Sequence, residues 1–80
     1  NNVVNLSLYP NPAKDILTVS IANVDNATID VINALGQVVL TVKNASETNT
    51  LNLANLAKGV YFVTVTNGQQ KSTQKLVIEK

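Results

Sequence analysis

The sequence predicts an all-β protein, a small immunoglobulin-like antiparallel β-sandwich of about seven strands. Val, Ile and Thr recur in short segments in which apolar and polar residues alternate, as expected for half-buried strands. Asn, Gly and Pro separate these segments every ten or so residues, a spacing typical of sandwiches and barrels. Apolar spacings of three and four never persist beyond the single turn that residues 54–58 could form, so no helix is expected.

The alternation predicts which side chains of each strand point into the core. They are Leu6 and Leu8 in the first strand, Leu17, Val19 and Ile21 in the second, Ile29 and Val31 in the third, Val38, Leu40 and Val42 in the fourth, Leu51 and Leu53 in the fifth, Tyr61, Val63 and Val65 in the sixth, and Leu76 and Ile78 in the last. Phe62, Lys71, Lys75 and Glu79 are then expected to point outward.

Turn-forming residues predict the connections between these strands. The first strand should end at Tyr9, Pro10, Asn11 and Pro12, because proline cannot donate a ladder hydrogen bond. Turns are also expected at residues 23–26 and 33–36, with Gly36 at positive φ. The polar segment 43–49 is expected to be a loop, and the Asn-Gly pair at residues 67–68 predicts a hairpin.

The spacing of Leu56, Gly59 and Tyr61 resembles the corner of Greek-key sandwiches. In such corners the Tyr hydroxyl forms a hydrogen bond with the backbone a few residues upstream. We therefore expect these three residues, together with Gly36 and the segment of Tyr9, Pro10, Asn11 and Pro12, to have structural roles.

The composition excludes several classes of function. The 80 residues include six Lys, no Arg and five acidic residues, for a net charge of +1, too weak a basic footprint for nucleic-acid binding. The chain has neither Cys nor His, which excludes disulfides, Ser-His-Asp catalysis and most zinc sites. The acidic residues are scattered along the chain. We therefore expect no enzymatic activity, no cofactor and no metal.

The length of the chain and its lack of Met suggest that it is a part of a larger protein. Eighty residues correspond to one domain, and we expect residues 1–80 to form a single unit excised from a longer secreted polypeptide, since the chain contains no Met. No signal peptide opens the chain and no segment has the ~20 apolar residues of a membrane helix.

Three blocks of the sequence carry a resemblance to a known family. They are LYPNPA followed by DIL at residues 8–17, NALGQVV at residues 33–39, and LAKGVYFV at residues 56–63 continuing through the hairpin to KLVIEK at residues 75–80. Together they resemble the type A C-terminal sorting domain of type IX secretion in the Bacteroidota. The resemblance spans nearly the whole chain. Gln37 departs from it, because family members often carry Arg at this position.

The resemblance implies a secretion signal that performs no chemistry. Such a domain follows an unrelated N-terminal cargo in the same polypeptide, and the cargo crosses the inner membrane by a separate signal peptide. The implied partners are the outer-membrane translocon, its shuttle protein and a sortase. The implied location is the periplasm in transit, then the cell surface or the medium.

The last hairpin and strand are the expected recognition element, because a terminal edge strand offers unpaired backbone groups and accessible lysines. The residues predicted to contact the translocon are Gly68, Lys71, Lys75, Leu76, Val77, Ile78 and Lys80. Two alternatives remain open. A carbohydrate-binding or adhesion module of a secreted enzyme would expose aromatic residues such as Phe62, and a structural spacer would be dispensable for export.

Overall fold

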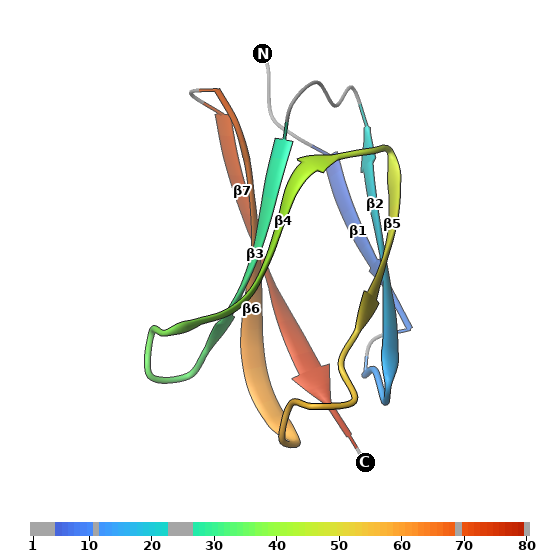
Figure 1. Ribbon diagram of the computed structural model, residues 1–80, viewed down its shortest axis with the longest axis vertical. Coiled ribbons are helices and arrows are strands. Elements are labelled where there is room, and N and C mark those ends of the chain that lie inside the picture. The colour runs from blue at the N-terminus through green and yellow to red at the C-terminus, as the bar shows by residue number, and fades with distance from the viewer. Residues whose placement is uncertain (1–4, 11, 23–26, 69, 80) are drawn as a thin grey trace.

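The computed structural model describes residues 5–10, 12–22, 27–68 and 70–79, in which seven strands form two antiparallel sheets (Figure 1). The strands are β1 (Asn5–Tyr9), β2 (Ile16–Ala22), β3 (Ala27–Asn33), β4 (Val38–Ala45), β5 (Thr48–Asn52), β6 (Gly59–Asn67) and β7 (Gln70–Ile78). The first sheet has the order β1-β2-β5 and the second has the order β4-β3-β6-β7. The predicted all-β sandwich is therefore confirmed. None of the described residues forms a helix, so no helix able to span a bilayer is found among them.

The core lies between the two sheets because apolar residues occupy alternate positions of their strands. Leu17, Val19 and Ile21 of β2 are almost completely buried, as are their counterparts in β3, β6 and β7. The inward positions predicted for these four strands are confirmed. These strands supply nine of the ten largest fully buried side chains, the exception being Leu53. Burial of apolar surface is the main stabilising contribution to a domain of this size.

Strand β4 belongs to the same sheet as β3, β6 and β7. In the seven-stranded arrangement of immunoglobulin constant domains, the fourth strand instead lies in the sheet of the first two. Here β3 and β4 pair as a hairpin through the turn at residues 33–37. The four-stranded sheet consequently has β4 at one edge and β7 at the other, with β3 and β6 between them (Figure 1).

The prediction that Val38 points inward is wrong. The pairing of β3 with β4 shifts register between Val31, which lies opposite Leu40, and Ile32, which lies opposite Val38. An extra residue in one strand reverses which side chains face the core. Val38 is therefore 55 % exposed, whereas Leu40 and Val42 pack against the core as predicted.

The prediction of a loop at residues 43–49 is also wrong. Strand β4 continues to Ala45, which is buried opposite Ala27, and β5 begins at Thr48 opposite Ser20. Only residues 46 and 47 connect the strands, and Asn49 closes this connection with hydrogen bonds to both backbone groups of Ser46. The polar residues of this segment belong to β4 and β5, which are edge strands with one side facing water. Their polarity therefore reflects the solvent-facing side of a strand and does not indicate a loop.

The other described turns agree with the prediction. The Asn33 Oδ1 atom accepts hydrogen bonds of 2.9 Å from the backbone N–H groups of Leu35 and Gln37, and Gly36 has a φ of 87°. Asn67 pairs with Gln70 across the β6–β7 hairpin, in which Gly68 has a φ of 62°. The turn predicted at residues 23–26 lies outside the described residues.

Candidate functional site

The predicted recognition residues lie on both faces of β7. This strand pairs with β6 in continuous register from Ile78 opposite Gly59 to Gln70 opposite Asn67. Lys71 and Lys75 are exposed and Val77 is half-buried, whereas Leu76 and Ile78 are 0 % and 1 % exposed. Gly68 lies in the exposed turn that precedes the strand. Lys80 lies outside the described residues.

The outer edge of β7 is partly covered by two other segments of the chain. The backbone N–H of Glu79 donates to the carbonyl oxygen of Ala13 over 2.7 Å, and the Ala13 N–H donates to the Val77 carbonyl oxygen over 2.8 Å. Further along the strand, Gln74 Nε2 donates to the Leu6 carbonyl oxygen over 2.5 Å. The expectation that this edge offers unpaired backbone groups is therefore wrong at Val77 and Glu79.

The segment that holds the end of β7 follows the predicted proline turn. The bond between Tyr9 and Pro10 is cis, and Asn11 lies outside the described residues. Ala13 is completely buried, and the carbonyl oxygen of Asp15 accepts a hydrogen bond of 2.6 Å from Leu53 N–H. This segment thus connects β7, in the four-stranded sheet, to the end of β5, in the three-stranded sheet.

The corner before β6 has the predicted geometry. The Tyr61 hydroxyl donates to the Ala57 carbonyl oxygen over 2.7 Å, Leu56 packs against the core, and Gly59 has a φ of 147°.

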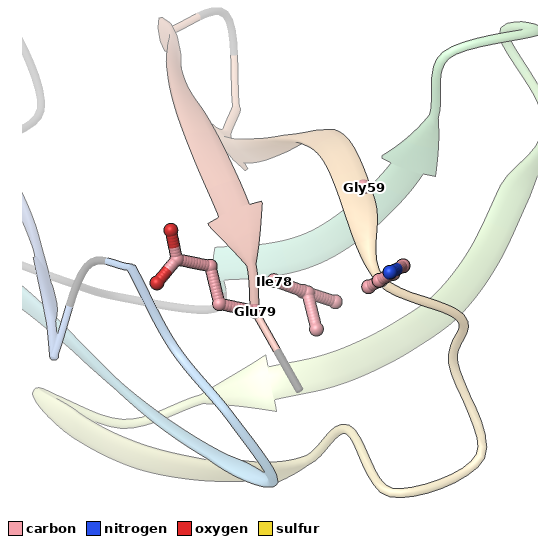
Figure 2. Close-up of a pocket in the computed structure, with 4 residues that line it drawn as sticks. Gly59, Ile78 and Glu79 are labelled. Atoms are coloured by element: carbon pink, nitrogen blue, oxygen red, sulfur yellow. The ribbon is translucent and has the colours of Figure 1, made fainter.

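Gly59 and Ile78 line a hollow of about 570 Å³ that Lys58 and Glu79 complete. Figure 2 shows the Ile78 side chain directed toward Gly59 and the Glu79 carboxylate directed away from it.

The outward face of the four-stranded sheet has two different parts. Its middle is polar: Thr41 donates to Asp30 over 2.9 Å, and the Thr64 and Thr73 hydroxyls lie 3.1 Å apart. One end is apolar. Val38, Ile32 and Phe62 lie in register across β4, β3 and β6, and Val60 and Val77 form the neighbouring pair of β6 and β7. We call these five residues the outer apolar patch.

This patch was not predicted as a site. The parity of β3 and β6 already places Ile32, Val60 and Phe62 outward, so a signal was present in the alternation. The membership of Val38 depends on the register shift with β3. Val38 is 55 % exposed, Val60 39 % and Phe62 38 %.

Neither a metal centre nor an aromatic platform is formed by the described residues. Among them, no three His, Cys, Asp or Glu side chains come together as a metal would require. Tyr61 is buried, whereas Tyr9 and Phe62 point outward from different sheets, so the exposed rings lie on opposite faces of the sandwich. The two exposed rings therefore cannot stack on one sugar together.

Comparison with known proteins identifies relatives across almost the whole chain. Residues 7–79 match the family model of the secretion system C-terminal sorting domain. The chain is 40 % identical over 74 residues to β-agarase A of Zobellia galactanivorans, and 32 % identical over 78 residues to ulvan lyase NLR42 of Nonlabens ulvanivorans. It covers 13 % and 15 % of the lengths of these two proteins, and the matches take in 90 % and 95 % of the chain.

A solved structure has the same fold. PorZ, an essential surface component of the type IX secretion system of Porphyromonas gingivalis, superposes with a TM-score of 0.82 at 16 % sequence identity. The superposition covers 95 % of this chain and 12 % of PorZ. At this identity the similarity supports the sandwich fold. The family match across residues 7–79 supports a sorting function in place of catalysis, and the chain belongs to the family of secretion system C-terminal sorting domains.

Proposed function

We propose that this domain directs a covalently attached N-terminal cargo through the type IX outer-membrane translocon. In this proposal residues 1–80 are the C-terminal unit of a longer exported protein. The domain passes through the periplasm in transit and is recognised by the translocon, its shuttle protein and a sortase, and the cargo reaches the cell surface or the medium. The observation that carries the proposal is the family match across residues 7–79.

Recognition by β7 is proposed to use its outward side chains. Lys71, Lys75 and Val77 share one face of the strand, so a partner can contact all three without disturbing the core. Leu76 and Ile78 are buried beneath them. Their contribution in the folded domain is to fix the position of β7, and Gly68 contributes the tight turn before it. We propose that the Lys80 side chain adds a further positive charge for the partner.

Export of a reporter tests the proposal. A fluorescent protein with a signal peptide at its N-terminus and these 80 residues at its C-terminus is expressed in a type IX-competent host and in the same host without the translocon. We expect fluorescence outside the cells of the first host only. Retention in the periplasm of both hosts, with the domain folded, would contradict the proposed function.

A lysine comparison tests the contribution of β7. Lys71→Ala combined with Lys75→Ala is expected to reduce export. Lys14→Ala combined with Lys43→Ala removes the same charge from exposed positions outside β7 and is the matched control. Equal export of both double variants would exclude a role for the β7 lysines.

A further inference from the structure

The outer apolar patch is a feature of the described surface that folding does not explain. The strands would form as well with polar β-branched residues, because the rest of the same face carries Thr28, Thr41, Thr64, Thr66 and Thr73. Single exposed apolar side chains are common on proteins. Here, however, apolar residues occupy adjacent positions on all four strands at one end of the sheet.

The patch continues into the neighbouring turn. Leu35, between β3 and β4, is 84 % exposed. Leu35 and Val60 both line a hollow of about 230 Å³, together with Lys58, Gly59 and residues of the same turn. A partner that covers the flat patch can therefore also place a side chain between the β3–β4 turn and the start of β6.

Two lysines lie beside the patch. Lys75 lies directly across from Phe62, at the end of the apolar row, and Lys58 lines the hollow beside Val60. Asp30 is the only acidic residue of β3, β4, β6 and β7. The other lysines of these strands, Lys43 and Lys71, lie toward the opposite end of the sheet. Asp30 already accepts the hydroxyl of Thr41. The Glu79 carboxylate is directed away from Gly59 (Figure 2).

We propose that the outer apolar patch docks a segment of a protein in the secretion machinery, one that presents apolar side chains flanked by Asp or Glu. This inference rests on the proposed function and names the surface that such a partner contacts. Apolar burial at the centre with complementary charge at the rim is the arrangement of specific protein interfaces.

Paired substitutions test the patch in the reporter fusion. Phe62→Thr combined with Val38→Thr removes the apolar centre and retains residues that favour strands. Ile16→Thr is the control, because this side chain is 47 % exposed on the outward face of the other sheet. We expect the patch variant to lower the ratio of exported to periplasmic reporter at least about fivefold, and the control to leave it unchanged.

Two further variants test the same surface by changing one exposed residue each. Leu35→Asp changes an exposed turn residue and is expected to reduce export even if the double variant fails to fold. Lys75→Glu should also reduce export by reversing the charge beside Phe62, whereas Lys14→Glu should not. Melting curves of the purified fusions establish which variants are folded.

The outcomes separate this proposal from the proposed function. If the unmodified fusion is not exported, the proposed function fails. If it is exported and folded Phe62, Val38 and Leu35 variants are exported equally well, the docking surface is wrong. Phe62-dependent sedimentation of the domain with phosphatidylglycerol vesicles, or a Phe62-dependent dimer in sedimentation velocity, would overturn a protein partner in favour of a membrane or a second copy.

Discussion

The hydroxyl of Tyr61 donates a hydrogen bond to the carbonyl oxygen of Ala57, four residues upstream, over 2.7 Å. The ring itself is 7 % exposed and belongs to the core. Because Ala57 lies in the connection from β5 to β6, this bond fixes the point where the chain passes from the three-stranded to the four-stranded sheet. The start of β6, opposite the end of β7, is held in place by the same bond.

Replacing Tyr61 by Phe tests this bond. The ring remains in the core, but the Ala57 carbonyl loses its partner. We expect a loss of about 1 kcal/mol in the free energy of unfolding, and hence a melting temperature lower by roughly 4–8 °C for a domain of this size. Urea denaturation measures the first quantity and a thermal scan the second. Tyr9→Phe is the control, because Tyr9 is half exposed, and its midpoint should not move.

Gly59→Ala should destabilise the corner through the backbone. A Cβ added at Gly59 would meet no atom within 4 Å, but the φ of 147° is one that L-residues rarely adopt. The expected loss is about 1–3 kcal/mol. Gly68→Asn is the comparison, since a φ of 62° is in the left-handed region that Asn tolerates. A urea midpoint of Gly59→Ala equal to that of the unmodified domain would contradict this prediction.

Ala13→Leu should loosen the end of β7. Ala13 is completely buried and pairs with Val77 and Glu79, so three additional carbon atoms have no space. Overpacking of this kind costs about 1–3 kcal/mol. We expect faster hydrogen exchange of the Glu79 amide, which donates to Ala13. Ala34→Leu, in an exposed turn, serves as the control; unchanged exchange at Glu79 in the Ala13 variant would show that this pairing does not hold the strand.

Leu76→Ala separates the structural from the recognition role of β7. Leu76 is completely buried, and truncating such a residue costs about 2–5 kcal/mol. Because a small domain has little stability to lose, we expect a much lower denaturation midpoint and, through unfolding, reduced export. Val77→Ala removes a half-buried outward side chain and should lower the midpoint less. If Leu76→Ala blocked export while the midpoint stayed unchanged, direct recognition of Leu76 would be indicated.

The candidate site was predicted only in part. Lys71 and Lys75 were expected on the outward face of the last strand because strict alternation with Leu76 and Ile78 leaves them no other direction. The hydrogen bonds of Ala13 to Val77 and Glu79 were not predicted. They join residues more than sixty positions apart in sequence, and no local pattern carries that information.

The amino-acid sequence by itself determined the strands β2, β3, β6 and β7, the corner at Tyr61 and the turns at Gly36 and Gly68. Each depends on alternation or on a backbone conformation that few residues adopt, and both are local properties. Only the tertiary structure decided that Val38 faces outward, that residues 43–45 and 48–49 are strands, and that β7 is covered at its end. These features depend on cross-strand register and on pairing between distant segments, which the packing of the two sheets selects.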